Sequence, residues 1–486
     1  MSARYIMAVD QSTSASKVFL LDAHGQIAGR FSKSHRQYYP APGHVEHDAG
    51  EIWQNVREGI RALSQGGEEI AGLAISNQRE TTVFWDRATG EPLCPAVVWQ
   101  DVRGQYICHE LAAYEDSIRA QTGLTLSAYF PAAKAAAKLR EEPKLRRLAK
   151  DGKLCIGTVD SYLIYRLTGG RVFRTDLSNA SRTQLMDLKT LRWSRELCGL
   201  FDIPMQCLPE IAPCDAAFGV TSAEGIPSGV PITGVMGDSH AAFFGQGCHQ
   251  RGMAKATYGT GSSVMMHIGE TPLLSSQGLS TSVGYAFRGE TCYVLEGNVT
   301  SSGDTLRWLC DEAGLTADIA EAEKLASQVE DTQGVYLVPA FSGLGAPYNQ
   351  AQARAVICGL NRGSAKKHIV RAALESIAYQ DADIIRAMEA DTMSDLQELR
   401  ADGGPSANSL LMQFQADVLG CPVQCAPASE LSALGAGYMA GLTLGLYTAA
   451  QLAGHAAGKL YLPQKPLQWR EAALAGWKAA VARCAS

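Results

Sequence analysis

Apolar and polar positions alternate in short blocks at the start of the chain and predict strands there. The segments RYIMAVDQS, KVFLLDAHG and QIAGRFSK carry apolar runs separated by Asp and Gly turn signals. This order favours an antiparallel meander over a nucleotide-binding βαβ unit. EIWQNVREGIRALSQ follows with apolar residues at helical spacing, and EIAGLAIS then predicts a buried strand.

A similar order of elements returns in the second half. VPITGVMGDSHAAFFGQG predicts a strand, a polar turn and a helix, whereas MAKATYGTGSSVMMHIG predicts a hairpin with a Gly, Ser and Thr tip. ELRADGGPSANSLLMQFQADVLG again predicts a strand, a Gly-rich turn and a helix, and helices are expected to dominate between about residues 110 and 230. We therefore expect two α/β domains, residues 1–250 and 251–486, that meet near residues 246–254.

Composition narrows the class of protein. The chain of 486 residues is 46% hydrophobic and 19% charged, which is ordinary for a globular protein of two or three domains. Its net charge of -6 contains no basic block, which argues against a nucleic-acid partner. No apolar run approaches the roughly 20 residues that a membrane-spanning helix needs, so we expect no membrane partner.

Cysteine usage and the N-terminus suggest a compartment. The 13 cysteines are an odd number, scattered and without a CxxC pair, and are typical of reduced thiols in a cytosolic protein. No signal peptide precedes the strand that begins at Tyr5. We therefore expect the protein to be cytoplasmic.

Three polar turns have the composition of anion-binding loops. DQSTSASK and YGTGSS present hydroxyls and backbone N–H groups, and Lys17 adds a point charge suited to phosphate. A polar hairpin tip is an equally good interpretation of each loop taken alone, and neither matches the P-loop motif. The turn in DGGPSAN lets a flat ligand approach the backbone and a helix N-terminus. Together the loops suggest a nucleotide in a cleft.

Two carboxylates end apolar strands. Asp10 and Asp238 are each followed at once by polar residues, so each can project into a cleft between the domains. One could hold Mg²⁺ and the other could accept a proton from a substrate hydroxyl. For Asp238, which precedes SHAAFFG, a helix cap is the alternative.

A third group of residues suggests a grip on vicinal hydroxyls. In NQRETT, Arg79 can donate and Glu80 can accept hydrogen bonds directly after a buried strand. Trp99 in VVWQD offers an apolar face to a carbon chain. A surface ion pair beside a core tryptophan explains the same residues.

Taken together, the motifs resemble those of the FGGY carbohydrate kinases, and among these the glycerol kinases. The resemblance runs from about Tyr5 to Tyr447 and rests on an ordered set of segments: DQSTS, YPAPGHVEHDAGEIW, ISNQRETTVFWDRATGEPL, VVWQD, GTVDSYLIYRLTGG, SNASRT, GDSHAAFFGQ, GMAKATYGTG, VPAFSGLGAPY, ALESIAYQ and DGGPSANSLLMQFQAD. It implies two actin-like, hexokinase-type (ribonuclease-H-like) domains with ATP in the cleft between them. It also implies an ATP- and Mg²⁺-dependent kinase of a small polyol or sugar, and by analogy a homodimer or homotetramer.

The resemblance assigns residues to ATP and the metal. Asp10 is expected to support Mg²⁺. The remaining nucleotide-binding residues that it implies are Thr13, Ser14 and Lys17 in the first phosphate loop, Gly259, Thr260 and Gly261 in the second, and Gly303, Arg307, Gly404 and Asn408 near the nucleotide.

The polyol pocket is assigned in the same way. The resemblance implies that Arg79, Glu80, Tyr129 and Asp238 hold the polyol, with Trp99 against its carbons and Asp238 as general base. A carboxylate within hydrogen-bond reach accepts the alcohol proton as the phosphorus–oxygen bond forms.

The sequence departs from the glycerol-kinase pattern on both sides of the cleft. Ser12 replaces Gly, and Lys17 replaces an Arg that could fork onto phosphate oxygens. In the substrate pocket, Ser239 replaces Gln, Ser263 replaces Phe, and Ala137 replaces Trp. We expect a larger and more polar pocket, suited to glycerol or to a somewhat larger polyol or ketose.

Two other functions remain compatible with these residues. One is a catalytically weak sensor that binds sugar and nucleotide and reports by closing its domains; retention of Asp10 and Asp238 speaks against it. The other is an ATPase of the same fold that acts on protein, and the NQRET motif speaks against that.

Overall fold

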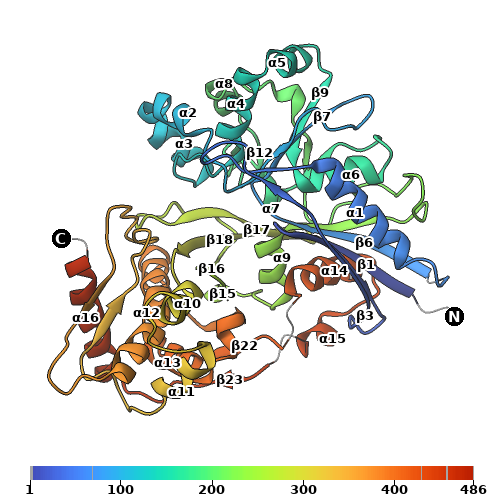
Figure 1. Ribbon diagram of the computed structural model, residues 1–486. Helices are drawn as coiled ribbons and strands as arrows, with labels where there is room; N and C mark the ends of the chain where they lie inside the picture. The colour runs from blue at the N-terminus through green and yellow to red at the C-terminus, as the bar shows by residue number, and fades with distance from the viewer. Residues whose placement is uncertain (1–3, 68, 428–429, 456–457, 485–486) are drawn as a thin grey trace.

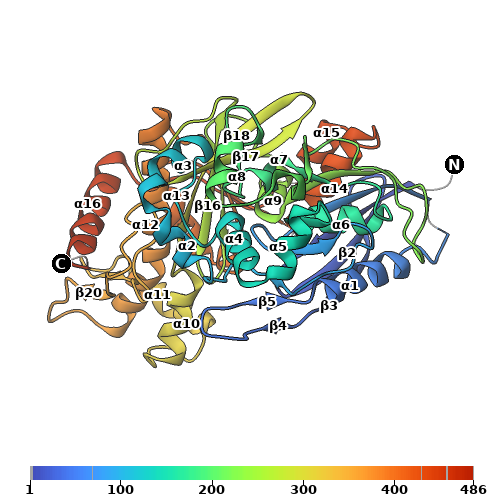
Figure 2. The same cartoon turned by 90° about the horizontal axis from the view of Figure 1, so that it is seen from above.

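Two large sheets, one in each half of the chain, organise the molecule. The computed structural model describes residues 4–67, 69–427, 430–455 and 458–484. Figure 1 shows the blue-to-green elements mostly above the yellow-to-red ones. The helices α12 (Lys366–Thr392), α13 (Ser409–Leu419) and α16 (Leu467–Cys484) gather at one end, away from α1 (Ala49–Ala62) (Figure 2).

The first sheet begins with the predicted meander. Its strand order is β14-β6-β1-β2-β3, where β1 pairs antiparallel with β2, and β2 with β3. β6 and β14 run parallel to β1, so their carboxyl ends meet at one edge. The bounds are β1 (Arg4–Gln11), β2 (Ala15–Leu21), β3 (Ile27–Ser34), β6 (Glu69–Asn77) and β14 (Ile232–Gly237).

Helices cover both faces of this sheet. The helix predicted at EIWQNVREGIRALSQ is confirmed as α1, and it begins two residues earlier because Asp48 caps it and accepts hydrogen bonds from the N–H groups of Gly50 and Glu51. On the other face lies α14 (Leu431–Thr443), which comes from the C-terminal half and packs on β1, β6 and β14. A Cβ at Gly234 of β14 would lie 2.5 Å from the carbonyl oxygen of Ala436 on α14, so the close approach of this helix requires glycine there.

A smaller sheet and most of the short helices extend the first half. The sheet has the order β4-β5-β8-β7-β9, with bounds β4 (Gln37–Tyr38), β5 (Glu46–His47), β7 (Thr82–Asp86), β8 (Ala96–Val97) and β9 (Leu154–Thr158). The helices are α2 (Gln105–Glu110), α3 (Glu115–Thr122), α4 (Pro131–Glu141), α5 (Pro143–Lys150), α6 (Val159–Leu167), α7 (Leu177–Ala180), α8 (Arg195–Leu200) and α9 (Asp238–Gly245), with 3-10 turns η1 (Ala112–Tyr114) and η2 (Met205–Cys207). Two strand pairs complete this half: β10 (Arg174–Asp176) with β13 (Glu210–Ala212), and β11 (Met186–Asp187) with β12 (Arg192–Trp193). Residues 110–230 thus hold helices, as expected, together with short strands.

The second sheet repeats the order of the first. It runs β17-β18-β16-β15-β21-β22-β23, with β15, β16 and β18 antiparallel and β21 and β22 parallel to β15. The bounds are β15 (Met253–Tyr258), β16 (Ser262–Gly269), β17 (Ser280–Phe287), β18 (Glu290–Val299), β21 (Glu398–Gly403), β22 (Val423–Cys425) and β23 (Leu460–Tyr461). The predicted hairpin at MAKATYGTGSSVMMHIG is therefore confirmed as β15–β16.

The remaining elements surround the second sheet. They are α10 (Gly303–Asp311), α11 (Ile319–Ala326), β19 (Tyr336–Val338), β20 (Val356–Cys358), η3 (Gly404–Ala407) and α15 (Ala449–Ala453). The core helix α12 packs against α13, β16 and β18. Among the described residues, no helix combines the length and the apolar character that crossing a bilayer demands.

Candidate active site

Asp10 and Asp238 meet at the carboxyl edge of the first sheet. Asp10 lies near the end of β1, and Asp238 directly follows β14. Ser76 of β6, the strand between them, lies opposite both Asp10 and Met236 in the register. The outer ends of parallel strands are the usual ligand-binding edge of a sheet. The expectation that both carboxylates face one cleft agrees with this placement.

Asp10 is held in a buried position. It is 6% exposed, and Ser76 Oγ donates a hydrogen bond to its Oδ1 at 3.1 Å. Burial raises the pKa of Asp10 to about 7; the charge of Lys17 opposes this and that of Asp238 adds to it. Because burial disfavours the ionised form of this carboxyl, a cation beside Asp10 would stabilise that form.

Asp238 faces the cleft rather than capping a helix. Gly237 occupies the N-cap position of α9 without a side-chain bond, so Asp238 is the first helical residue. Among the described residues, its one hydrogen bond comes from the N–H of the adjacent Ser239 to Oδ1 at 2.7 Å, and 34% of its side chain is exposed. Burial raises the pKa of Asp238, and Arg79, whose Nε lies 3.5 Å away, opposes the rise. The carboxylate is therefore available to a ligand.

Arg79 and Glu80 belong to a buried network and not to a surface ion pair. Their side chains are 7% and 2% exposed. Arg79 donates two parallel hydrogen bonds to Glu296 of β18, at 3.0 and 2.9 Å. Arg182 completes the network with a hydrogen bond of 2.7 Å to Glu80 and an ion pair with Glu296, in which the nitrogen and oxygen lie 2.9 Å apart. Two guanidinium groups thus face two carboxylates across the boundary between the halves.

The network holds Glu80 in an unfavourable backbone conformation. Its φ is 60°, a left-handed value that non-glycine residues rarely adopt. The bonds of Arg182 to its carboxylate and of Lys134 Nζ to its carbonyl, at 3.3 Å, fix this turn. Such strain is typical of functional sites.

The opposite charges of the network shift the pKa values of its members strongly and keep them ionised. Burial alone would raise the pKa of Glu296, but Arg182 and Arg79 lower it to well below its usual range. Burial would lower the pKa of Arg79, and the charges of Glu296 and Glu80 instead raise it well above its usual range. Glu296, Arg79 and Arg182 are therefore ionised at neutral pH, and each guanidinium group already has a carboxylate partner.

The aromatic residues predicted for the polyol pocket lie together beside the first phosphate loop. The rings of Trp99 and Tyr129 meet edge to face at 5.7 Å. Trp99 Nε1 donates to Thr13 Oγ1 at 3.0 Å, which joins this wall to the loop. Lys134 Nζ donates to the carbonyl of Tyr129, and burial lowers the pKa of Lys134 to about 7.

The two serines that depart from the family pattern lie in the same region. Ser263 of β16 donates to Glu296 Oε1 at 3.3 Å. Ser239 follows Asp238 in the first turn of α9. Both side chains are partly exposed, and Ala137 on α4 is fully buried at 0% exposure. The two serines are therefore partly accessible, whereas Ala137 lies in the protein core and does not widen a pocket.

The first phosphate loop forms the tight turn between β1 and β2. Ser12 N donates to the carbonyl of Ala15 at 2.9 Å, and His35 Nε2 donates to the carbonyl of Thr13, also at 2.9 Å. Ser14 is exposed at the tip. Lys17 forms an ion pair with a residue of the C-terminal half of the chain: its Nζ lies 2.8 Å from the carboxylate of Glu430, just before α14.

The second phosphate loop packs on the N-terminus of α10. Gly303 N donates to the carbonyl of Gly259 at 2.9 Å, and Ser302 N to that of Thr260 at 2.8 Å. A Cβ at Gly261 would clash with the carbonyl oxygen of Val299, and one at Gly303 would lie 2.5 Å from that of Gly259. Only glycine permits this contact.

The DGGPSAN turn joins the same place. Gly403 lies opposite Tyr258 in the register, and a Cβ on it would clash with the carbonyl oxygen of Tyr258. Gly404 begins η3, where a Cβ would meet no atom within 4 Å, and Asn408 caps α13 by accepting the N–H of Leu411 at 2.9 Å. Arg307 is exposed on α10, about one turn after Gly303. The second and third of the loops predicted to hold a nucleotide thus lie side by side.

The structure adds site residues that were not predicted. Arg182 and Glu296 complete the network around Arg79, and Glu430 pairs with Lys17. A signal for Glu296 was present, since a lone carboxylate interrupts the apolar strand CYVLEGNV. Such a residue in a buried strand needs a charged partner.

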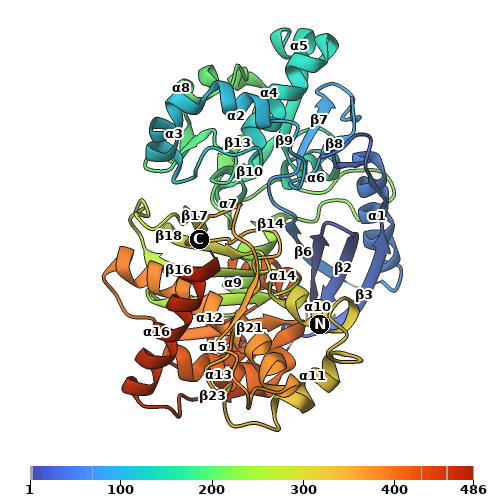
Figure 3. The ribbon, with the colours of Figure 1, turned by 60° about the vertical axis from the view of Figure 1, so that its left-hand side comes forward.

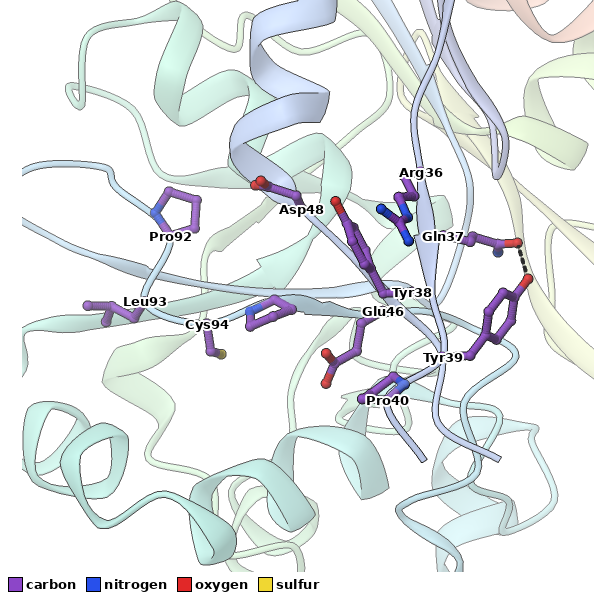
Figure 4. Close-up of a pocket in the computed structure, with 11 residues that line it drawn as sticks. Arg36, Gln37, Tyr38, Tyr39, Pro40, Glu46, Asp48, Pro92, Leu93 and Cys94 are labelled. Atoms are coloured by element: carbon purple, nitrogen blue, oxygen red, sulfur yellow. Dashed lines mark hydrogen bonds between the residues drawn. The ribbon is translucent and has the colours of Figure 1, made fainter. Parts of the chain in front are cut away.

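A separate cavity lies away from these groups. It has a volume of about 800 Å³ and is lined by residues 36–40, Glu46, Asp48 and residues 92–95 (Figure 4). None of the predicted site residues lines it. The reactive groups gather instead at the carboxyl edge of the first sheet and in the ion network around Arg79.

Comparison with known proteins supports a common origin over the whole chain. Residues 5–245 match the model of the N-terminal domain of the FGGY family of carbohydrate kinases, and residues 254–444 match its C-terminal domain. A glycerol kinase of Alkalilimnicola ehrlichii is 47% identical over 98% of both chains. Glycerol kinase 1 of Thermotoga maritima is 45% identical over 98% of this chain and 99% of its own.

Solved structures agree with these matches. A Plasmodium falciparum glycerol kinase with ADP superposes with a TM-score of 0.95 at 34% identity, over 99% of this chain and 98% of that one. A gluconate kinase of Lactobacillus acidophilus, at 23% identity, shares the fold with a TM-score of 0.89. The expected pair of actin-like, ribonuclease-H-like domains is confirmed.

Proposed function

The chain belongs to the FGGY family of carbohydrate kinases, and on that premise we propose that its acceptor is an uncharged polyol or sugar longer than glycerol. The reaction class is that of its relatives: an ATP-dependent, glycerol-kinase-like transfer of phosphate to a hydroxyl of a small polyol or sugar. The observation that carries the acceptor proposal is Ser263, a small polar residue in the pocket wall where glycerol kinases carry Phe.

The charges in the pocket support an uncharged acceptor. Arg79 and Arg182 are both neutralised by Glu80 and Glu296 at bonding distances. A carboxylate substrate would have to compete with these buried partners, whereas hydroxyl groups can use their remaining donors and acceptors. We therefore expect polyols and ketoses to bind better than aldonic acids.

Asp238 is the proposed general base. Its carboxylate is open to the cleft and accepts a hydrogen bond only from Ser239 N among the described residues. A hydroxyl held by Arg79 and Glu80 would lie beside it, with Trp99 and Tyr129 against the carbon chain. The carboxylate accepts the hydroxyl proton as the oxygen attacks phosphorus.

The nucleotide is assigned to the three predicted loops. Thr13, Ser14 and Lys17 would face the phosphates from one side and Gly259, Thr260 and Gly261 from the other. Gly303, Arg307, Gly404 and Asn408 are proposed to lie near the nucleoside, since their loops pack directly on the second phosphate loop. For Lys17 to reach phosphate, its bond to Glu430 must be exchanged.

Mg²⁺ fits the groups at Asp10. Mg²⁺ is usually held by one or two carboxylates together with substrate phosphates and water. Asp10 is a buried carboxyl with one hydroxyl partner and a raised pKa, so a nearby cation would stabilise its ionised form. Asp10 would hold the ion, which supplies neutralisation of phosphate charge when bound.

A cytoplasmic location and a homo-oligomeric state complete the proposal. All 13 cysteines are free thiols, which suits a reducing compartment. The oligomeric state rests on analogy with the family, and light scattering of the purified protein would determine it.

The test is coupled ADP release at saturating Mg-ATP with glycerol, erythritol, xylitol, several ketoses and several aldonic acids. We expect the highest kcat/KM with a polyol or ketose longer than glycerol. Ser263→Phe should shift the preference back towards glycerol by filling the pocket with a ring. Preference of the wild type for glycerol, or for an aldonic acid, would refute the acceptor proposal. With every acceptor that the wild type phosphorylates, Asp238→Asn should lose turnover while it still binds ADP.

A further inference from the structure

Three lysines are buried among the described residues, and they differ in how their charges are satisfied. Lys138 is 7% exposed and pairs with Glu142 at 2.6 Å. Lys134 binds the carbonyl oxygens of Glu80 and Tyr129. Lys255, which is 1% exposed, donates a hydrogen bond to the hydroxyl of Thr257, with Nζ 2.5 Å from Oγ1.

Lys255 therefore has no carboxylate partner among the described residues. Its Nζ bonds to a neutral hydroxyl, and its neighbour across the ladder on β21 is another cation, Arg400. Asp402 lies opposite Thr257 in the register, and no ion pair joins it to Lys255 in the described part of the chain. A buried cation without a counterion is costly, so its position suggests that an anion approaches it during function.

The register places Lys255 on the sheet face that meets the N-terminal half of the chain at Glu296. Lys255 lies opposite Met265, Thr257 opposite Ser263, and Met265 opposite Glu296, so all these side chains share one face. The same face holds Glu296, which binds Arg79. Figures 1 and 3 show α9, which begins with Asp238, beside the edge of this sheet, and its contacts with β17 agree.

The direction of the side chain brings its charge towards the second phosphate loop. Nζ reaches along β15 to the level of Thr257, two residues before Gly259. Thr257 is opposite Ser263 of the acceptor pocket. The charge is also close enough to Asp238 to lower the pKa of that carboxyl slightly. The ammonium thus lies between the proposed base, the acceptor pocket and the phosphate loop.

We propose that Lys255 is a further catalytic residue whose ammonium group contacts the phosphoryl group as it passes from ATP to the acceptor. This inference rests on the proposed function. In the step, the acceptor oxygen forms a bond to the γ-phosphorus while the bond from that phosphorus to the β–γ bridging oxygen breaks. The acceptor proton goes to Asp238, and ADP leaves with the bonding electron pair.

The physical reason is the charge that this step moves. Negative charge spreads over the three equatorial oxygens of the transferring group, and the guanidinium groups nearby are already neutralised by Glu80 and Glu296. Because the proposed acceptor is uncharged, the phosphoryl group is the anion available to Lys255. A preorganised, water-excluded cation stabilises the transition state without reorganisation.

The experiment compares Lys255→Met and Lys255→Gln with wild type and with Lys138→Met, a matched buried lysine outside the site. Removing one preorganised donor is expected to lower kcat by about 10²-fold or more. ADP affinity and the acceptor KM should stay unchanged. Lys138→Met should keep the wild-type kcat, which controls for the loss of a buried charge elsewhere.

A second measurement separates transition-state stabilisation from ground-state binding. In the presence of acceptor, aluminium fluoride should tighten ADP binding to the wild type, because it mimics the transferring phosphoryl group, and should not do so in Lys255→Met. Should Lys255→Met fail to fold, Lys255→Gln answers the same question, since it keeps a donor to Thr257 but has no charge.

The outcomes are distinct. Wild-type kcat in Lys255→Gln, or equal tightening by aluminium fluoride in both proteins, would overturn the role of Lys255. A raised acceptor KM with unchanged kcat would do the same and assign Lys255 to acceptor binding. If the wild type phosphorylates no polyol or sugar, the proposed function itself fails; an active wild type beside equally active variants refutes only the inference.

Discussion

Replacing Glu296 by Gln tests whether the buried ion network holds the two halves of the molecule in their active arrangement. The Glu296 carboxylate accepts two hydrogen bonds from Arg79, at 3.0 and 2.9 Å, and lies 2.9 Å from Arg182. Both arginines come from the N-terminal half, whereas Glu296 lies on β18 of the second sheet. The amide has nearly the same shape but no charge.

The expected cost follows from burial. Glu296 is 1% exposed, and its replacement leaves two buried guanidinium groups with Glu80 as their remaining carboxylate in the network. Removing one partner from a buried ion pair costs about 3–5 kcal/mol, because the remaining charge stays desolvated. We expect a loss of that size in the free energy of unfolding, measured by urea titration at pH 7.

The chain offers a control with the same geometry at the surface. Arg174 donates two bonds of 3.0 Å to Glu210, whose side chain is 63% exposed. Glu210→Gln should cost about 0–1 kcal/mol, because exposed pairs are weak. Equal losses in the two variants would refute the argument from burial.

The same variant has a kinetic signature. Without Glu296, Arg79 loses the partner that orients it beside Asp238, so the acceptor KM should rise. The affinity for ADP should stay at the wild-type value, because in the described part of the chain none of the residues assigned to the nucleotide bonds to this carboxylate. A variant that loses ADP binding to the same degree would indicate general unfolding instead.

Four other ionisable groups of the site give measurable outcomes. Since burial raises the pKa of Asp238, the plot of kcat/KM against pH should fall on its acid side at a higher pH than an ordinary carboxyl gives; a fall only near pH 4 would contradict this. Asp10→Asn, studied without metal or nucleotide, should become more stable relative to wild type as the pH rises from about 4 to 7, by at most about 4 kcal/mol. The reason is that folded wild type keeps the Asp10 proton up to a pKa of about 7, whereas the unfolded chain releases it near pH 4. A difference between the urea midpoints of the two proteins that does not change with pH would refute this. Burial lowers the pKa of Lys134 to about 7, so the folded protein releases this proton at a lower pH than the unfolded chain does. The stability of wild type relative to Lys134→Met, measured in thermal melts, should therefore increase between about pH 7 and 10. Lys17→Met should raise the KM for ATP with a stability loss of about 0–1 kcal/mol, since its pair with Glu430 is partly exposed; an unchanged KM would leave Lys17 with an interdomain role only.

Local patterns gave the elements of the fold and the nucleotide loops. The meander, α1, the β15–β16 hairpin and the strand–turn–helix at DGGPSAN all formed as expected, because turn residues and apolar periodicity act over a few neighbours. The motifs also indicated that Asp10 and Asp238 share a cleft, because both follow strands whose parallel ends meet at one edge.

Those local patterns could not predict contacts between residues that lie far apart in the sequence. Nothing near Lys17 in the sequence indicates Glu430, which lies 413 positions away, and α14 packs on a sheet formed by the opposite half of the chain. The assignment of residues 251–486 to one separate domain did not anticipate this crossing.

The family, the reaction class and the kinds of residue at the site follow from the order of motifs along the chain alone. How the charges balance depends on the folded arrangement: Arg79 is satisfied by Glu296 and Arg182 by Glu80, and Lys255 is left without a carboxylate among the described residues. The physical reason is that the energy of a buried charge depends on its distance to partners from other elements and on its exclusion from water. Folding sets both quantities, and spacing along the chain records neither.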